Sequence, residues 1–391
     1  MCGYTNHKRD LNEKSRFFFD LLPSELHIVI KSFFKHQKDI YIIGGAVRDF
    51  LFGEPIGDFD LATNARPEQI TKYMNEVRVK TKPIGKKFGT VLAIVGKKAF
   101  DISTFRHEHF KILGEPPEVN FVESLEEDLV RRDFTINTIA FDPKNMKFID
   151  KFGGIDDIQN NRLRVIGDAF IRFNEDGLRI IRFARFMSQF NLTPDSVSLN
   201  AIADIGNTAR FRNPDALRIE LFKILDLPNP SSGLKLLWKN EIFDTIFSKF
   251  PFSKSQNMLL VLDEGINRFN EIPRRQILIR LFGLLILFAD ESTLSQDNWL
   301  QIGNNLNLSQ KQREILNRLY QSWITFPSDP LSRELKHWVR RTGINTSEDI
   351  LPLIFLKAKI FEDSKISDKK ELFSNKVYKL LTHFRRTPDD D

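Results

Sequence analysis

Short apolar runs dominate the first 150 residues, and their spacing predicts a domain built from both strands and helices. Strands are predicted where a run is apolar and β-branched, at 40–43, 90–95, 99–105 and 148–150. Helices are predicted where apolar residues recur every three or four positions, at 23–34, 46–52, 67–74 and from 124 onward. Gly96-Lys97 lies between two of the strands and predicts a tight hairpin.

The pattern changes near residue 150, where Gly153-Gly154 marks a turn. From Ile155 onward the strand signals fade and helical periodicity dominates. The segment RFNEDGLRIIRFARF, residues 172–186, predicts one helix with Glu175 and Asp176 in its first turn, where the helix dipole favours negative charge. We therefore expect an α+β region before residue 150 and a helical region after it.

The chain of 391 residues is long enough for about two to four domains, in agreement with this change of pattern. Its net charge of +6 favours a polyanionic partner, although 52 acidic residues dilute the positive field. Cys2 is the single cysteine, so a disulfide framework is excluded and a cytoplasmic location is expected. The 36 phenylalanines predict aromatic cores. No signal pattern is present, and the longest apolar run, 277–289, contains Arg280 and is too short to span a bilayer.

The stretch DIYIIGGAVRDFLFGEPIGDFDLAT, residues 39–63, carries the first candidate chemistry. Gly44-Gly45 ends a strand and opens a helix, so the backbone there can approach a phosphate and present free N–H groups to it. Asp58 and Asp60 would project from the same face of a strand, with Phe59 turned into the core. Neighbouring carboxylates repel each other unless a cation such as Mg²⁺ lies between them. The alternative is a plain strand, turn and helix with two solvated aspartates.

Further candidates follow in the next hundred residues. Asp101 lies in another predicted strand and is a candidate third carboxylate, with a solvent-facing strand aspartate as the alternative. The polar, proline-containing stretch 106–119 predicts a mobile loop. Ser124 fits a capping box, and the helix that it starts is expected to carry Arg131-Arg132. Adjacent arginines can position a triphosphate and ribose, although a solvated charge run is the more common interpretation of such a cluster.

Arginines recur every three residues in the segment 172–186, at Arg179, Arg182 and Arg185. This spacing gives a basic stripe that drifts slowly around the predicted helix. The plain interpretation is an amphipathic helix in which Glu175 and Arg179 pair across one turn, with a contribution of only tenths of a kcal/mol.

Five strings occur in one order over roughly residues 40–190: GGAVRDFLFGEPIGDFDLAT, FDISTFRHE, EEDLVRRDFTINTIAFD, IDKFGGIDDIQNNRLRVIG and RFNEDGLRIIRFARF. Together they resemble the family of class II CCA-adding enzymes (tRNA nucleotidyltransferases) and bacterial poly(A) polymerases. The resemblance implies a polymerase-β-like nucleotidyltransferase head with a small mixed sheet, followed by an all-helical neck, body and tail. The expected parts are an N-terminal helical segment at 1–38, the head at 39–150, the neck at 151–226, and the body and tail at 227–391.

The resemblance also implies roles for individual residues. Asp58 and Asp60 match the metal-binding pair, and Asp101 takes the place of the catalytic acidic residue on the neighbouring strand. The residues that match nucleotide contacts of the head and neck are Gly44, Gly45, Arg48, Arg132, Asn137, Asp176, Arg179, Arg182 and Arg185.

The implied reaction is nucleotidyl transfer from CTP and ATP to the 3′-hydroxyl of tRNA with two Mg²⁺ ions, which adds CCA. The helical C-terminal half would hold the tRNA acceptor arm by its phosphate backbone and shape, and neither a membrane nor a protein partner is implied. A poly(A) polymerase, or an enzyme restricted to A or to CC, carries nearly the same motifs and stays an alternative. A catalytically inactive RNA-binding relative is a further alternative. The presence of all the acidic and basic residues of the expected site argues against it, namely Asp58, Asp60, Arg132, Asp176 and Arg179.

Asp176 and Arg179 provide a physical argument for base choice. An ionised carboxylate only accepts hydrogen bonds, and a guanidinium only donates them. Cytosine and adenine both offer an amino donor beside a ring acceptor, which fits this pair, whereas uracil and guanine present the reverse pattern. The pair therefore predicts selection of C or A without specifying the order of addition.

Overall fold

The computed structural model describes residues 10–84, 88–110, 117–252, 277–290, 294–327 and 333–360. The chain divides into two compact units, one of Met1–Arg179 with Phe190–Ile205 and one of Ile180–Gln189 with Gly206–Asp391. Helix α8 (Leu178–Gln189) passes from the first unit into the second. This division lies elsewhere than the boundaries expected at 150 and 226, which stay predictions.

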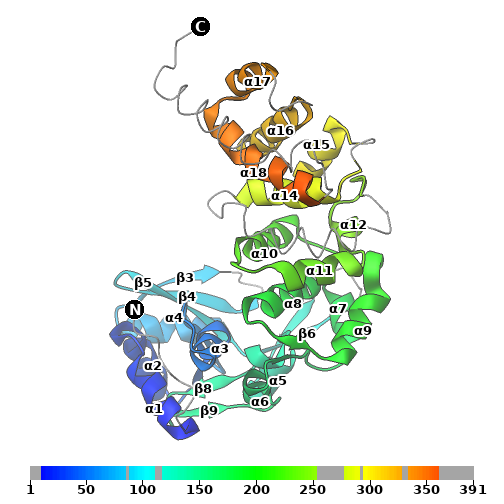
Figure 1. The fold of residues 1–391 in the computed structure, drawn as a ribbon. Helices are drawn as coiled ribbons and strands as arrows, with labels where there is room; N and C mark the ends of the chain where they lie inside the picture. Colours follow the sequence, from blue (N-terminus) through cyan, green and yellow to red (C-terminus); the bar gives the residue numbers. More distant parts are fainter. Residues whose placement is uncertain are drawn as a thin grey trace. The chain divides into compact units, whose positions relative to one another are not determined.

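A seven-stranded sheet in the order β3-β4-β5-β2-β1-β8-β9 organises the first unit (Figure 1). Its strands are β1 (Ile40–Ile43), β2 (Asp60–Thr63), β3 (Lys80–Ile84), β4 (Thr90–Val95), β5 (Lys98–Thr104), β8 (Ala140–Asp142) and β9 (Lys147–Ile149). Within this sheet β2 and β5 pair in parallel and the other neighbours pair antiparallel, so the predicted mixed sheet is confirmed. Strands β3 and β8 have no counterpart among the predicted strands.

Helices pack on this sheet in the first unit: α1 contacts β9, α2 and α3 contact β1, and α4 contacts β3, β4 and β5. The helices of this unit are α1 (Leu11–Asp20), α2 (Ser24–Lys35), α3 (Gly45–Phe52), α4 (Pro67–Glu76), α5 (Leu125–Val130), α6 (Gly154–Gln159), α7 (Ala169–Glu175) and α9 (Ser196–Ile205), with the 3-10 turn η3 (Thr135–Asn137). Phe18 of α1 is fully buried, with its ring centroid 4.8 Å from that of Phe50 and 4.9 Å from that of Phe141. The predicted aromatic core is therefore confirmed here.

A second apolar layer brings α5 to the sheet. Ile43, Ala62 and Ala140 are buried together with Phe105, and Leu125 of α5 packs against this cluster. Because the chain leaves α5 at residue 130, this packing carries the two arginines that follow the helix toward the ends of the central strands.

The stretch 106–119, predicted to be a loop, contains two strands. β6 (Arg106–His109) and β7 (Glu118–Phe121) pair antiparallel over four residues each, and 111–116 lie outside the described residues. The sequence did not predict this pair because β6 contains no apolar residue and because the alternation of β7 is limited to Val119 and Phe121, which is too short a run to indicate a strand. A short parallel pair, β10 (Arg162–Leu163) with β11 (Thr193–Pro194), was also missed.

The prediction of a single helix at 172–186 is wrong. One helix, α7, ends at Glu175, and the next, α8, begins at Leu178, with Asp176 between them. Asp176 has extended backbone angles, φ −154° and ψ 104°, and its Oδ1 accepts a hydrogen bond from the Leu178 backbone N–H at 3.1 Å. Asp176 thus caps a new helix. Likewise Arg131 and Arg132 follow α5 instead of lying inside it, and the Ser124 side chain makes no capping hydrogen bond.

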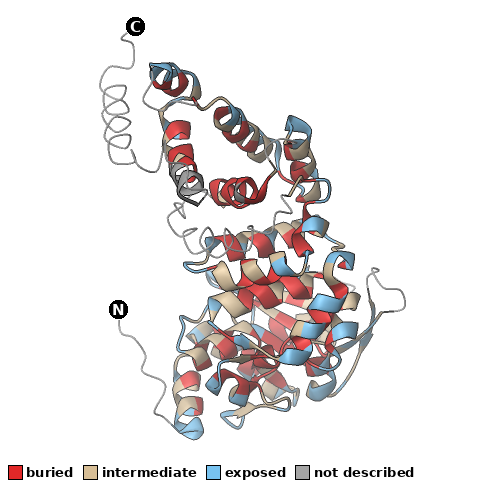
Figure 2. Cartoon of the chain, turned by 45° about the vertical axis from the view of Figure 1, so that its right-hand side comes forward, coloured by how far each residue is buried: buried red, intermediate tan, exposed pale blue. Residues whose placement is uncertain are grey.

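The described part of the second unit is mainly helical, as predicted. Besides α8 it contains η4 (Gly206–Thr208), α10 (Pro214–Asp226), α11 (Ser231–Lys239), α12 (Ile242–Ile246), α14 (Ile277–Phe288), α15 (Gln296–Asn305), α16 (Gln310–Ile324), α17 (Glu334–Thr342) and α18 (Ile344–Ile360). Figure 2 shows buried positions on the inner sides of these helices and exposed positions on the outer sides. Arg280 of α14 is fully buried and donates to the backbone carbonyls of Leu225 and Leu227. No helix among the described residues is long and apolar enough to cross a membrane.

Candidate active site

The glycine turn between β1 and α3 lies beside a carboxylate and a guanidinium. Gly44 has φ 70° and ψ −130° and is the N-cap residue of α3. A Cβ atom at Gly44 would lie 3.7 Å from Asp60 Oδ2 and 3.8 Å from Arg132 Nη1. Two predicted residues of the first string, Gly44 and Asp60, therefore meet Arg132 of the third string at one point. A backbone without a side chain is what leaves space there.

Asp60 and Asp101 face each other across the two central parallel strands. Asp60 opens β2, where it pairs with Ile43 of β1, one residue before the glycine turn. Its other neighbour in register is Asp101 of β5. Asp60 is exposed at the surface, but nearby protein atoms still remove part of the hydration of its carboxylate. This loss of hydration and the charge of Asp101 raise the pKa of Asp60 to about 6, and the Arg132 guanidinium partly opposes this shift. The sheet thus holds two carboxylates at a distance where they repel each other.

Asp58 precedes β2 and is exposed, so the prediction that it lies within the strand is wrong. Phe59 is half-buried and its ring centroid lies 6.5 Å from that of Phe18, which is the expected direction. Burial first, and then the charge of Asp58, raises the pKa of Asp101. The charge of Asp101 and, to a smaller extent, that of Asp58 also raise the pKa of Asp60.

The carboxylates of Asp60 and Asp101 fit a divalent cation by their chemistry. Asp101 Oδ1 is buried and has no hydrogen-bond partner among the described residues. In that same part of the chain, no three His, Cys, Asp or Glu side chains are placed so that they could hold a metal ion together. A hard cation beside Asp60 would satisfy the unpartnered oxygen of Asp101 and would relieve the repulsion between the two carboxylates. Carboxylate oxygens are the ligands that Mg²⁺ prefers.

Arg48 and Asn137 form one hydrogen-bonded group next to the glycine turn. Arg48 Nη1 donates to Asn137 Oδ1 at 2.8 Å, and Asn137 Nδ2 donates to Asp133 Oδ1 at 2.9 Å. The guanidinium also contacts the Asp49 carboxylate at 2.7 Å, and a Cβ atom at Gly45 would lie 3.6 Å from Arg48 Nη2. The structure therefore brings these predicted nucleotide contacts together, and Asp133 fixes the orientation of Asn137.

Arg132 is held in place by Asp128, which the sequence interpretation did not select as a site residue. Asp128 is fully buried, and its carboxylate accepts from Arg132 Nη2 at 3.1 Å and from Arg131 Nε at 2.9 Å. Burial alone would raise the pKa of Asp128, but the charges of Arg132 and Arg131 hold it below its usual value. The spacing of three and four residues was the available signal, because it places such partners on one side of a helical turn.

Arg179 is connected to the same region through a chain of polar contacts within the first unit. Its Nη1 donates to Glu175 Oε2 at 2.6 Å and to the Arg172 carbonyl at 2.7 Å. Arg172 in turn donates to the backbone carbonyls of residues 131 and 132, at 2.5 and 2.7 Å. The predicted pairing of Glu175 with Arg179 is thus present. Arg172 is a further residue of this network, to which the sequence interpretation gave no role.

Arg185 lies in the second unit, where it is buried against Glu220 of α10. Arg185 Nε donates to Glu220 Oε2 at 2.7 Å, and the two residues are 9% and 5% exposed. Arg182 is half-buried, with its guanidinium carbon 5.9 Å from the Phe186 ring centroid. The nucleotide contacts expected of Arg182 and Arg185 stay predictions, while the Arg185 pair has a clear structural role.

Glu220→Ala is expected to destabilise the protein by about 3 kcal/mol, because it removes the carboxylate that neutralises a buried guanidinium. Lys223→Ala is the matched control: it removes a second contact to Glu220, at 3.0 Å, from a side chain that is 52% exposed. That control should cost less than about 1 kcal/mol. Urea unfolding measures both, and equal losses would contradict the structural role of the Arg185 pair.

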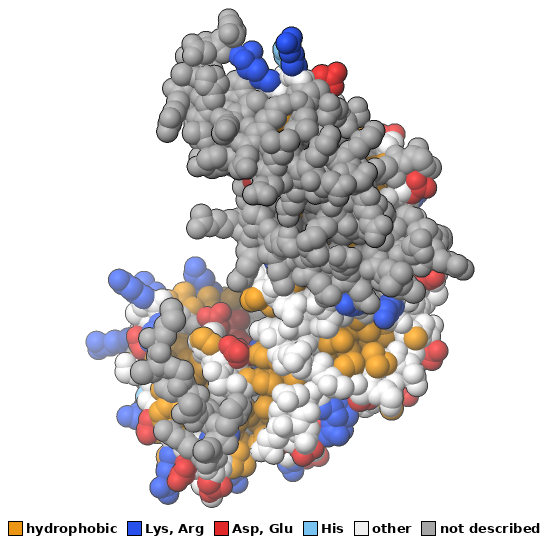
Figure 3. Space-filling view, in the orientation of Figure 1, with side chains coloured by type: hydrophobic (Ala, Val, Ile, Leu, Met, Phe, Trp, Pro, Cys, Tyr) orange, Lys and Arg blue, Asp and Glu red, His pale blue; other side chains and the backbone are white. Residues whose placement is uncertain are grey.

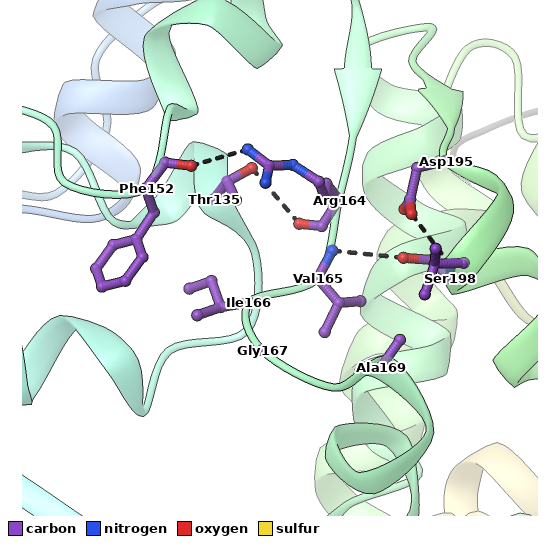
Figure 4. Close-up of a pocket in the computed structure, with 10 residues that line it drawn as sticks. Thr135, Phe152, Arg164, Val165, Ile166, Gly167, Ala169, Asp195 and Ser198 are labelled. Carbon is purple, nitrogen blue, oxygen red and sulfur yellow. Dashed lines mark hydrogen bonds between the residues drawn. The ribbon is translucent and has the colours of Figure 1, made fainter.

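A cavity of about 230 Å³ lies elsewhere in the first unit (Figure 4). Its lining includes Arg164, which donates to the Phe152 carbonyl at 2.8 Å, and Asp195, which accepts from the Ser198 backbone at 3.3 Å. None of the predicted site residues lines it. On the face drawn in Figure 3, basic and acidic side chains alternate over the described residues, so the positive net charge does not form one continuous field there.

Comparison with known proteins supports the same interpretation of the head. Residues 40–164 match the family described as the poly A polymerase head domain. The chain is 36% identical over 216 residues to the CCA-adding enzyme of Anoxybacillus flavithermus, covering 55% of this chain and 53% of the relative. It is 40% identical over 212 residues to that of Geobacillus stearothermophilus, covering 54% and 51%. The chain thus spans about half the length of these relatives. The match to the CCA-adding enzyme of Staphylococcus haemolyticus is longer, 31% identical over 352 residues, with 89% of this chain and 80% of the relative covered.

Solved structures share the fold. The crystal structure of the Bacillus stearothermophilus CCA-adding enzyme in complex with CTP superposes with a TM-score of 0.69 at 24% identity, over 93% of this chain and 84% of that one. The Thermotoga maritima CCA-adding enzyme complexed with tRNA superposes with a TM-score of 0.65 at 20% identity, over 95% and 85%. The polymerase-β-like head with a helical C-terminal region is therefore confirmed. Because the match to the Staphylococcus relative extends over most of both chains, the protein belongs to the family of CCA-adding enzymes.

Proposed function

We propose that the chain is a CCA-adding enzyme, which transfers CMP twice and AMP once from CTP and ATP to the 3′-hydroxyl of tRNA. The observation that carries this proposal is the meeting of Gly44, Asp60 and Arg132, where a side chain on the glycine would lie within 4 Å of both others. The relatives that are named CCA-adding enzymes, and their solved complexes with CTP and with tRNA, support the choice of substrates.

The chain's own residues supply binding and electrostatics for this reaction. The RNA 3′-oxygen bonds to the α-phosphorus while the bond to pyrophosphate breaks, so negative charge develops on the leaving group. Arg132 and Arg48 neutralise that charge, and the N–H groups that open α3 bind phosphate oxygens. Asp58 and Asp60 would hold Mg²⁺, which lowers the pKa of the attacking hydroxyl. The Asp101 carboxylate, whose Oδ1 is buried and unpartnered among the described residues, would be a further metal ligand and would assist the removal of the hydroxyl proton.

Base selection and tRNA binding complete the proposal. Asp176 and Arg179 would read the Watson–Crick edge of C or A, and the second unit would bind the acceptor arm through phosphates and shape. Arg179 is 7% exposed and already paired with Glu175, so reading a base requires part of that pairing to be exchanged for the nucleotide. The cytoplasmic location stays a prediction.

A poly(A) polymerase is the alternative within the same fold, and the substrate of the first step distinguishes the two. The assay offers ATP alone, then CTP alone, to a tRNA that lacks its last three nucleotides and to an unstructured RNA of equal length. A CCA-adding enzyme should add two C to the tRNA and leave the unstructured RNA nearly unchanged. Long A tails on both RNAs would favour the alternative.

Gly44→Ala is expected to raise the KM for CTP and ATP by roughly tenfold or more. The left-handed φ of Gly44 is strained for alanine, and the added Cβ would occupy the space between Asp60 and Arg132. Gly57→Ala is the matched control, because nothing lies within 4 Å of a Cβ atom there. Steady-state kinetics measure both variants, and equal KM values for the two would contradict a role of the glycine turn at Gly44 in nucleotide binding.

A further inference from the structure

Strand β6 presents alternate side chains to the arginines that follow α5. Arg106, Glu108 and Phe110 are spaced by two residues, so they project from one side of the extended chain, and His107 and His109 project from the other. The first three are half-buried, and both histidines are exposed. The strand therefore has an inner side that contacts protein and an outer side that faces solvent.

Three guanidinium groups share two buried carboxylates on this inner side. Glu108 Oε1 accepts from Arg106 Nε at 2.9 Å and from Arg131 Nη1 at 3.2 Å, and its side chain is 13% exposed. The Asp128 carboxylate accepts from the Arg106 backbone N–H at 3.1 Å, in addition to its contacts with Arg131 and Arg132. Each carboxylate thus accepts hydrogen bonds from more than one residue. The three guanidinium groups and two carboxylates together carry a net charge of one positive unit.

Arg131 lies between the two carboxylates and can compete with Arg132. Its Nη1 contacts Glu108, while its Nε contacts Asp128 Oδ1. An arginine fork prefers to bind both oxygens of one carboxylate when the geometry allows it. If Glu108 lost its charge, Arg131 would turn toward Asp128 Oδ2, which is the oxygen that holds Arg132.

We infer that Glu108 is a positioning residue for the incoming nucleotide: by holding Arg131, it leaves one oxygen of Asp128 to Arg132. The Arg132 guanidinium lies beside the glycine turn. The inference rests on the proposed function, because it assigns to Arg132 a contact with the triphosphate and ribose. Those groups are common to CTP and ATP, so Glu108 affects the affinity for both nucleotides and leaves the choice between them unchanged.

Glu108→Gln, which keeps the size of the side chain and removes its charge, is the first test. The KM for CTP and for ATP should each rise roughly tenfold, as expected when a charge-assisted hydrogen bond to the nucleotide site is lost, while kcat stays within about twofold. His109→Gln changes the outer side of the same strand and should leave both constants unchanged. A Glu108→Gln variant with wild-type KM values, or with only a lowered melting temperature, overturns the inference.

A second variant separates positioning from simple stabilisation. The double variant Glu108→Gln with Arg131→Met lacks the arginine that would compete for Asp128. Arg132 therefore keeps its contact with Asp128, and the KM values should return to within about threefold of wild type. A role limited to holding the hairpin predicts the opposite, since the double variant loses more contacts than the single one. If Glu108→Gln does not fold, the double variant decides alone by the same KM criterion. A wild-type protein without nucleotide addition would refute the proposed function instead.

Discussion

Asp60→Asn is expected to abolish nucleotide addition while the protein stays folded. Asp60 pairs in register with Asp101, lies beside Gly44, and is one of the two residues proposed to hold Mg²⁺. The change removes one negative charge and half of the ligand pair, and catalysis in this class depends mainly on positioning and electrostatics. Asp58→Asn should have the same effect. Retention of more than about a tenth of the wild-type rate, which is about 1.4 kcal/mol of barrier, would refute the metal assignment.

The stability of Asp60→Asn provides an independent check with a defined sign. The folded state raises the pKa of Asp60 to about 6, so the native protein disfavours the charged form. Between the ordinary pKa and pH 6 the folded state binds more protons than the unfolded one, and this group therefore costs stability as the pH rises through that range. At pH 8 without Mg²⁺, Asp60→Asn should have a melting temperature equal to or above that of the wild type. Asp39→Asn, an exposed residue just before β1, should change neither activity nor melting temperature.

Asp176→Asn is expected to change which base is accepted. Asparagine keeps the side-chain oxygen that caps Leu178, so the start of α8 should survive, since asparagine and aspartate are equally good N-caps. Its amide adds a donor that can bind the carbonyl of uracil, where the carboxylate of the wild type would repel it. The ratio of kcat/KM for CTP to that for UTP should fall by roughly tenfold or more, because one mismatched polar contact costs about 1–3 kcal/mol.

Asp176→Ala completes this test by removing both functions. It should lower the free energy of unfolding by about 1 kcal/mol through loss of the cap, and it should also reduce discrimination against UTP. If Asp176 only caps the helix, Asp176→Asn will behave as wild type in all four nucleotide assays and Asp176→Ala will lose stability alone. An unchanged ratio of CTP to UTP in an active Asp176→Asn enzyme would contradict base reading by this residue.

Local signals in the sequence were sufficient for the centre of the head. The apolar run at 40–43, the glycine pair and the aspartates that follow lie within a few residues of each other, and the strand, turn and helix form where they were predicted. The parallel register that sets Asp101 opposite Asp60 was not predicted from the residues, and only the resemblance to the family placed Asp101 on a neighbouring strand. The break at Asp176 was missed because the regular spacing of the arginines outweighed the Asp-Gly pair, which is a helix-stop signal.

The remaining part of the site depends on contacts between distant residues. Arg172 binds backbone carbonyls about forty positions away, and Glu108 meets Arg131 across a hairpin whose strands are polar. Neither contact leaves a periodic pattern in the chain. Arg185 shows the opposite case, since the resemblance to the family implied a nucleotide contact for it while the structure pairs it with Glu220. The type of a residue and its spacing therefore predicted which groups are chemically useful, but burial determined which of them are already paired.

Sequencing of the RNA product shows whether the protein adds CCA. Wild-type protein with Mg²⁺ and all four nucleoside triphosphates would act on a tRNA that lacks its last three nucleotides, and the new 3′ ends would be read at single-nucleotide resolution. We expect nearly all extended molecules to end in CCA, with no further nucleotide added. Tails of A alone, ends containing U or G, or no extension beyond that of the Asp60→Asn protein would contradict it.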